Sequence, residues 1–325
     1  MPKWINDLSE TTPVVDAARR VLALRLEAVR DCLADALRDA EDRTRHIHAL
    51  RVATRRASAA LDVFRRCLPR KVSKAARQHV RALRRAVGAA RDWDVLMRQL
   101  AGGIATADEA DRPAFDMLMG YALAQRIPAQ RLLEKACPDY PFGFDRLQAR
   151  TLAAVRHRGT GGTLGDQARP LLARLVATLD AACDGDDRDW VHLHEIRLAG
   201  KRLRYALELF RGCFGQAHER LAPVLAGLQE VLGDVNDRYN AATLLRHILD
   251  GLGDCLPDGA ERYRRLIERQ IDEHSAAMVA GRDAYRRWLE QWRSADVRQS
   301  LATIHPSLTV RPASEARAVP LGRTA

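Results

Sequence analysis

Residues 48–67 show the clearest separation of apolar and basic positions in the chain. Placed on a helix, at about 100° per residue, the segment divides into two opposite faces. The apolar face carries Leu50, Ala53, Ala57, Ala60, Leu61 and Phe64, and the polar face carries His48, Arg51, Arg55 and Ser58. The pattern predicts a helix that packs through one face and presents a row of cations on the other.

The same pattern returns 146 positions later, in residues 194–213. Arg55 aligns there with Lys201, which keeps the positive charge. Nine positions of the first copy are identical in the second: His48, Arg51, Ala53, Arg56, Ala60, Leu61, Phe64, Arg65 and Cys67. A face that only contacts water has no reason to repeat its histidine and its cations in register with the core. The repeat therefore predicts two similar halves and a functional role for both helices.

The rest of the chain predicts further helices, and no stretch has a convincing strand alternation. An all-α fold is expected. A basic helix that starts at residue 70 is predicted to end or bend at residues 88–92, and the matching signature returns at residues 233–237. Other helices are predicted at about 12–39, 44–69, 112–137, 144–158, 167–183, 216–249 and 259–292.

Breaks in the helical pattern suggest the domain organisation. Residues 138–143 (PDYPFG) are the clearest linker, so we place one helical unit at 10–138 and a second at 144–293. The length of 325 residues suffices for two cores of ordinary size. Residues 294–325 lose the periodicity and contain Pro306, Pro312 and Pro320, and this tail is predicted to be disordered.

The positive charge is concentrated in one part of the chain. The net charge is +11, yet residues 43–91 alone hold fifteen Arg or Lys and a single acid, Asp62. Such a concentrated field implies an anionic partner. No apolar run is long enough to span a membrane, and six scattered cysteines without a CxxC pair indicate a reducing cytoplasm.

The acids among these cations are interpreted as orienting groups. Asp62 and Glu208 occupy matched positions in the repeat, as do Asp92 and Asp237 in the two later signatures. A lone acid among arginines relieves repulsion and orients its neighbours. No metal site or cofactor is predicted, because neither repeated histidine has a second ligand at helical spacing.

The motif H-x-x-R-x-x-x-[RK]-R resembles that of the conserved histidine α-helical domain (CHAD) family. It reads HALRVATRR at residue 48 and HEIRLAGKR at residue 194, and the resemblance covers roughly residues 10–293. It implies two four-helix bundles related by a pseudo-twofold axis, with basic helices that line a central channel or groove. It also implies binding of inorganic polyphosphate by a stand-alone, non-catalytic member, since no element of a fused triphosphate tunnel enzyme is present.

Combined with the helical pattern, this resemblance gives a set of candidate polyphosphate-binding residues. Arg25 is included as a cation on the inward face of the first helix, although the pairing of an inward Arg with an acid is an open alternative. The two histidines either contact the ligand or orient the helices. The full set is Arg25, His48, Arg51, Arg55, Arg56, Lys74, Arg77, Arg81, Arg84, Arg85, His194, Arg197, Lys201, Arg202 and Arg204.

Two other functions remain open from the sequence. A nucleic-acid-binding protein could use the same surface and other polyanions would also be attracted, but the basic rows contain almost no aromatic residue apart from Tyr205. A metal-dependent phosphoanhydride hydrolase would need carboxylates for Mg²⁺, for which Asp62 and Glu208 are the matched candidates. The favoured interpretation is a cytoplasmic protein that binds polyphosphate and associates with polyphosphate granules.

Overall fold

The computed structural model describes residue 5 and residues 7–38, 43–137, 139–156, 162–255 and 260–308. These residues form helices without a named strand, which confirms the predicted all-α class. The first half contains α1 (Val14–Leu37), α2 (Arg43–Val63), α3 (Arg70–Thr106), α4 (Arg112–Lys135) and α5 (Phe142–Ala153). The second contains α6 (Leu164–Cys183), α7 (Trp190–Leu209), α8 (Arg211–Cys255), α9 (Ala260–Arg293) and α10 (Ala295–Ile304). Short 3-10 turns follow α2 at Arg65–Cys67 and α10 at Pro306–Leu308.

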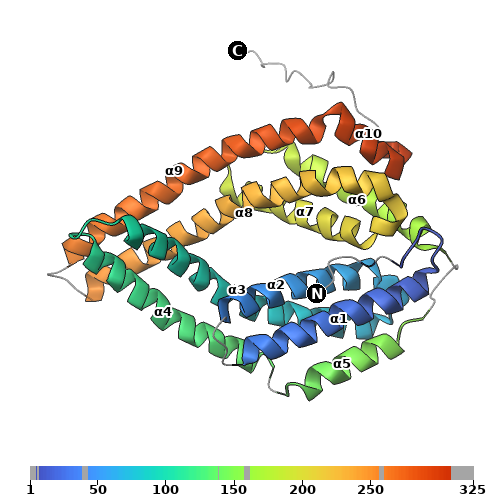
Figure 1. Cartoon of the computed structure of the whole chain (residues 1–325), viewed down its shortest axis with the longest axis horizontal. Coiled ribbons are helices and arrows are strands. Elements are labelled where there is room, and N and C mark those ends of the chain that lie inside the picture. The colour runs from blue at the N-terminus through green and yellow to red at the C-terminus, as the bar shows by residue number, and fades with distance from the viewer. Residues whose placement is uncertain are drawn as a thin grey trace, which may run out of the picture.

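The two copies of the repeated motif form α2 and α7, which lie on facing sides of the molecule (Figure 1). Their predicted apolar faces are confirmed. Every member of the stripe on α2, from Leu50 to Phe64, is at most 5% exposed, and the matching stripe on α7, from Ile196 to Phe210, is equally buried. Burial of these faces against their own halves leaves the opposite, cationic faces to meet across the centre.

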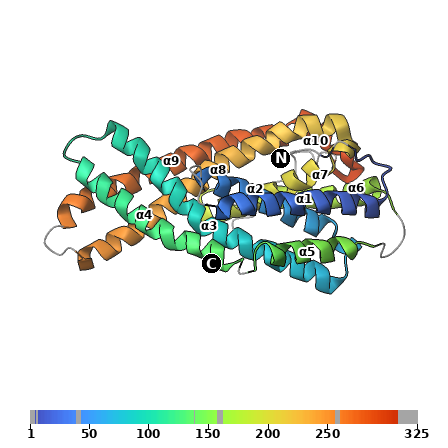
Figure 2. The same ribbon diagram turned by 60° about the horizontal axis from the view of Figure 1, so that its bottom comes forward.

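Contacts between the halves join helices that hold the same place in each half. The pairs in contact include α1 with α6, α2 with α7, α3 with α8 and α4 with α9. Figures 1 and 2 show the resulting elongated molecule, in which α8 and α9 run alongside the far ends of α3 and α4. The pseudo-twofold relation between the halves stays a prediction.

The buried residues do not divide into one core for each half. A large core is continuous through both halves, from α1 and α2 to α7 and α10. A smaller, distal core lies where the ends of α3 and α4 meet α8 and α9, and it contains Leu100, Phe115, Leu245 and Ile267. The sequence repeat predicts two similar halves, but packing merges their central helices and joins their far ends.

Local sequence explains several helix boundaries. Thr163 and Asp166 form a capping box at the start of α6, with the Thr163 backbone N–H donating to the Asp166 carboxylate over 2.9 Å. The Asp189 carboxylate accepts a hydrogen bond from the Val191 backbone N–H and so caps α7. At Gly215 the chain leaves helical geometry, with φ of 20°, which kinks α8 near its start.

Two expectations differ from the structure. The basic helix α3 continues through residues 88–92 to Thr106, because the apolar periodicity extends to Leu96 and Leu100, which are buried. The predicted disordered tail is wrong for residues 295–304, which form α10, because Val297, Leu301 and Ile304 recur at helical spacing and are buried. Residues 309–325 of that tail lie outside the described residues.

The predicted boundary between the helical units falls just before α5. This helix packs against α1 and α3 of the first half. Its Phe144 is buried in the large core. The second set of central helices starts only at α6, after a segment that partly lies outside the described residues. Among the described residues, no helix combines the length and the apolarity that crossing a membrane requires.

A buried polar network connects α1, α3 and α4. Arg126 donates from Nε to the Asp94 carboxylate over 2.7 Å and from Nη1 to the Gln130 side-chain oxygen over 3.2 Å. Gln130 in turn donates to the Ala36 backbone carbonyl over 3.2 Å. Asp94 and Arg126 are 4% and 7% exposed, so removing either charge would leave the other buried without its counter-charge.

We expect Asp94→Ala to lower the free energy of unfolding by about 3–5 kcal/mol, the usual cost of breaking a buried ion pair. Denaturant unfolding followed by circular dichroism measures it. The matched control is the double variant Asp94→Leu with Arg126→Met, which removes both charges and should recover most of the loss. Equal destabilisation of the two variants would contradict this account of the network.

Candidate anion-binding site

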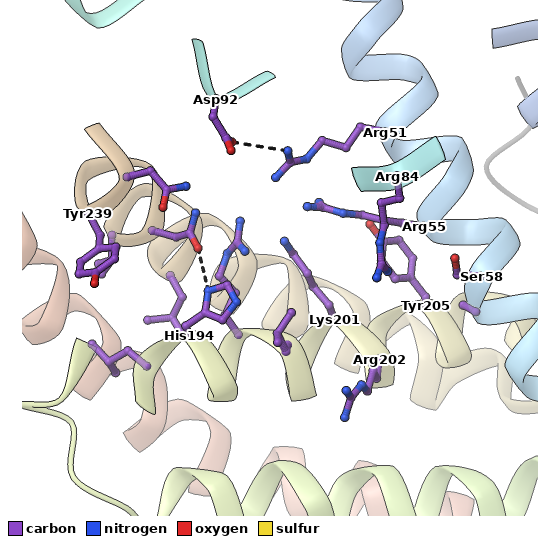
Figure 3. A pocket seen from close by; sticks show the side chains of 18 of the residues that line it. Arg51, Arg55, Ser58, Arg84, Asp92, His194, Lys201, Arg202, Tyr205 and Tyr239 are labelled. Carbon is purple, nitrogen blue, oxygen red and sulfur yellow. Dashed lines mark hydrogen bonds and ion pairs between the residues drawn. The ribbon is translucent and has the colours of Figure 1, made fainter. Parts of the chain in front are cut away.

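A cavity of about 770 Å³ lies between the facing halves. Its walls come from α2 and α3 on one side and from α7 and α8 on the other (Figure 3). Eight Arg or Lys side chains from the two copies of the repeat and from α3 line it: Arg51, Arg55, Arg77, Arg81, Arg84, Arg197, Lys201 and Arg202. The predicted cationic faces of the repeated helices therefore meet in one space.

Lys201 lies at the point where these charges act on one another most strongly. Its side chain is directed into the cavity in Figure 3, toward the groups contributed by α2. Loss of hydration, followed by repulsion from Arg197, Arg55 and Arg51, lowers the pKa of Lys201 to about 5. Without an anion in the cavity, the amine is neutral at neutral pH.

The arginines around Lys201 experience the same crowding. Loss of hydration and the charge of Arg55 lower the pKa of Arg51 and of Arg197 to about 10 in each case. Both guanidinium groups remain protonated at neutral pH. Arg55 is a cause of repulsion for both of them and for Lys201, so it is the centre of the cluster. A bound polyanion would relieve this repulsion.

Two repeat-related acids partly offset the charge at one side of the cluster. Asp92 of α3 lies 3.7 Å from Arg51, Oδ1 to Nη1. Loss of hydration raises the pKa of Asp92, Arg51 opposes that rise, and the nearby Asp237 of α8 adds to it. Asp92 is thus paired with Arg51 at the cavity wall, and its orienting role stays a prediction.

Two further hollows continue the basic surface beyond the central cavity. One of about 1080 Å³ runs between α2, α3 and α6, and one of about 630 Å³ follows the start of α3. Arg77 and Arg81 line all three spaces, so the hollows adjoin one another. The additional basic residues along these hollows are Arg65, Arg66, Arg70, Lys74 and Arg174.

Asp62 is the acid nearest to the junction of the hollows. Its Oδ1 lies 2.8 Å from the Nε of Arg77, and both side chains are substantially exposed. Asp62 lines the central cavity and the second hollow. It neutralises part of the charge of Arg77 where two basic spaces join, and the orienting role of Asp62 stays a prediction.

The matched acid Glu208 behaves differently because it is buried. It is 5% exposed, and its Oε1 lies 2.7 Å from the Nε of Arg56 and 3.6 Å from the Nη2 of Arg25. Loss of hydration lowers the pKa of Arg25, and Glu208 opposes this effect. Arg25 and Arg56, both predicted ligands, line none of the described cavities; they form a buried ion cluster with Glu208 instead.

Other predicted cations also fall outside the central cavity. Lys74 lines the hollow at the start of α3, while Arg204 lines a small separate hollow beside α8. Arg85 lines none of the described cavities, although it is exposed on α3. Helical spacing groups these residues with the cavity cations, but small angular differences around a helix decide which hollow each one reaches.

The two repeated histidines have different surroundings. His194 lines the cavity, and its Nδ1 makes a 2.8 Å hydrogen bond with the Asn236 side-chain oxygen. His48 lines none of the described cavities. Loss of hydration and the positive charge of Arg91 lower the pKa of His48, so it is neutral at neutral pH. Only the second histidine is positioned to contact a ligand in the cavity.

The sequence interpretation missed the aromatic part of the cavity. Trp190 and Tyr239 line it together with Tyr205, whereas only Tyr205 was noted near the basic rows. Tyr239 belongs to α8, far along the chain from the motif in α7, so spacing gave no sign that they meet. For Trp190 the sequence offers one signal, namely that this residue directly follows Asp189, the N-cap of α7.

No group of three or more His, Cys, Asp or Glu side chains that could hold a metal ion occurs among the residues that the structure describes. Asp62 and Glu208, the candidates for holding Mg²⁺, are each engaged by arginines, and they do not share a site. The chemistry offered by the cavity is thus that of clustered donors to an anion, chiefly guanidinium groups that make bidentate contacts with phosphate oxygens.

An all-helical protein with repeated basic helices facing a shared cavity is the class that the fold and the site define. Comparison with known families matches the CHAD domain to residues 20–246, and the chain belongs to this family. Comparison with curated proteins finds no match.

Two solved structures share the fold. The CHAD domain from the plant Ricinus communis has 24% sequence identity and a TM-score of 0.63, over 84% of this chain and 94% of that one. PptA from Streptomyces chartreusis has 16% identity and a TM-score of 0.66, over 86% of this chain and 100% of that one. At these identities the likeness concerns the fold alone.

The depressed pKa of Lys201 predicts a pH-dependent stability. Folded Lys201 is neutral above about pH 5, whereas in the unfolded chain it is protonated up to about pH 10. Between these values unfolding takes up a proton, so the contribution of Lys201 to stability rises with pH. We expect the melting temperature of the ligand-free protein to increase from pH 6 to pH 9, and Lys201→Met to reduce this slope.

Thermal unfolding in buffers without phosphate measures the effect. Lys135→Met is the matched control, because Lys135 is exposed at the end of α4 and lines none of the described cavities. Identical pH slopes in the wild type and Lys201→Met would show that the amine is not held neutral by its neighbours.

Proposed function

We propose that this CHAD protein binds inorganic polyphosphate in the central cavity and the adjoining hollows, without cleaving it. The observation that carries the proposal is the meeting of eight Arg or Lys side chains from both halves in one space. Polyphosphate is a flexible chain with about one charge on each phosphoryl unit, and it needs repeated donors along a track. The family resemblance implies the same ligand.

The continuity of the three hollows supports a ligand longer than a single phosphate. Arg77 and Arg81 belong to all three, so a chain could pass from the central cavity to the surface of α3 while it remains next to cations. Neutral Lys201 fits this function as well, because the arrival of a polyanion would favour its protonation and add one more charge to the contact.

We extend the proposal to a cytoplasmic protein that associates with polyphosphate granules through this site. Such a role needs affinity for long chains and slow dissociation, and both follow from many charge-assisted contacts along one ligand. Non-catalytic binding is part of the proposal. Among the described residues, carboxylates paired to arginine are the acids placed along the cavity, and these orient cations more readily than they hold Mg²⁺.

The test is a competition measurement at near-physiological salt. Labelled long-chain polyphosphate bound to the protein is displaced by unlabelled polyphosphate of increasing length, by DNA or by RNA, at matched phosphate concentration, while released phosphate is monitored. We expect displacement that improves with polyphosphate length, little displacement by nucleic acid, and no release of phosphate. Equal competition by DNA or RNA would instead favour the nucleic-acid-binding function.

Reversal of two cavity charges should remove most of this binding. We expect Arg51→Glu with Arg55→Glu to weaken the affinity for long-chain polyphosphate by about a hundredfold or more, since each charge-assisted contact contributes roughly 1.5–3 kcal/mol. The control is Arg131→Glu with Arg150→Glu, which makes the same change in net charge at exposed positions of α4 and α5. An equal loss in both pairs would mean that diffuse attraction, and no defined site, holds the ligand.

Removal of the acid at the junction of the hollows should have the opposite effect. We expect Asp62→Asn to strengthen polyphosphate binding several-fold, because it frees Arg77 from its ion pair and removes one repulsive charge from the ligand track. Titration of the same labelled polyphosphate measures it. Asp139→Asn, in the connection between α4 and α5, is the control, since neither Asp139 nor its partner Arg146 lines any of the described cavities. Weaker binding by Asp62→Asn would show that this acid positions Arg77 for the ligand.

A further inference from the structure

One end of the central cavity has an apolar and aromatic wall, which a polyphosphate chain does not use. Part of the cavity lining consists of apolar and aromatic side chains of α7 and α8: Trp190, Val191, Leu193, Leu198, Leu232, Val235 and Tyr239. A chain of phosphates gains nothing from such a wall. The wall must therefore have a structural role or contact a different part of a ligand.

Four of these side chains have a structural role, because Leu193, Leu232 and Val235 are buried in the large core and Trp190 packs against it. A structural role does not account for the exposure of the other three. Val191, Leu198 and Tyr239 are 62%, 39% and 41% exposed. In the described part of the chain, eight large hydrophobic residues are exposed to this degree, and three of them line this single cavity. Exposed apolar groups that gather at a hollow mark a ligand-binding surface more often than a packing defect.

The polar groups at this end include amide and imidazole side chains. Asn236 and Asn240 project from the same face of α8 as Tyr239, and His194 is hydrogen-bonded to Asn236 over 2.8 Å. Amide and imidazole groups can both donate and accept, which suits the edge of a nucleobase. An aromatic ring with an apolar surround suits its face.

The order of these groups along the cavity gives the orientation of the ligand. Figure 3 shows Tyr239 at one side, Lys201 with Arg55 and Arg84 at the other, and His194 between them. His194 and Lys201 are seven residues apart on α7, a rise of about 10 Å, which is comparable to the length of a nucleoside. A base beside Tyr239 would thus place its phosphates among Lys201 and the arginines.

We propose that the cavity also binds a nucleoside polyphosphate, with the base on the Tyr239 wall and the phosphates on the cationic cluster. The inference rests on the proposed function, because both ligands use the same cations. A free nucleotide fits better than a nucleic-acid strand. Arg51, Arg55, Arg197 and Lys201 influence one another strongly and surround one region, which suits several phosphates on one nucleoside better than one phosphate for each base.

The experiment compares ATP with inorganic tripolyphosphate, which offers the same number of phosphates without a base. Calorimetric titration of the full chain gives both affinities under one ionic condition. We expect ATP to bind about tenfold more tightly than tripolyphosphate, the scale of one base stacked on an aromatic side chain. Tyr239→Ala should remove this advantage and leave tripolyphosphate binding unchanged, while Tyr239→Phe should retain it.

Phe142→Ala is the matched control, because Phe142 is also an exposed aromatic residue, 70% exposed, and lies on α5 outside the cavity. Saturation-transfer NMR gives an independent readout: the adenine protons should receive saturation from the wild type and lose it in Tyr239→Ala. Equal affinities for ATP and tripolyphosphate, both unaffected by Tyr239→Ala, would overturn the inference and leave the proposed function intact.

Two other outcomes are decisive as well. Oligodeoxythymidylate and ATP are also compared as competitors of labelled long-chain polyphosphate at matched phosphate concentration. If oligodeoxythymidylate is the better competitor, the aromatic wall binds a nucleic-acid strand, and the nucleotide inference is wrong. If neither tripolyphosphate nor long-chain polyphosphate binds while the protein remains folded, the proposed function fails together with the inference.

Discussion

Repulsion between like charges across the centre of the molecule is the constraint on which the rest of the structure depends. Loss of hydration, together with repulsion among the cations of α2 and α7, lowers the pKa of Lys201 to about 5. The protein can tolerate this cost because the opposite faces of both helices are fully buried in the large core. Hydrophobic burial holds the two basic walls at a distance that their charges alone would increase.

Acidic side chains reduce this repulsion without cancelling it. Whether an acid is buried or exposed determines which arginines it pairs with. Glu208 is buried and takes two arginines, Arg25 and Arg56, out of the cationic surface. Asp62, its counterpart in the repeat, is exposed and restrains only Arg77 at the edge of the cavity. The same sequence position thus acts as a structural counter-charge in one half and as a local restraint on a ligand-facing arginine in the other.

Much of the fold could be predicted from sequence because helical periodicity is local. The buried stripes that include Phe64 and Phe210 follow directly from residue spacing, and the cavity faces of Arg51 and Arg197 lie opposite to them. What sequence could not supply were contacts between segments that lie far apart along the chain. The pairing of Arg25 with Glu208, the meeting of Tyr239 with α7, and the distal core around Phe115 all depend on packing between distant segments.

The contacts between equivalent helices carry a consequence for how such a chain could arise. Helices α1 to α4 each touch their counterparts α6 to α9, and both cores draw on the two halves together. Contacts of each element with its own equivalent are those that a self-complementary homodimer makes. A half-length ancestor could therefore have built both cores and the shared cavity by pairing with a second copy of itself. Gene duplication and fusion would then have freed each half to diverge, as the separate fates of Asp62 and Glu208 illustrate.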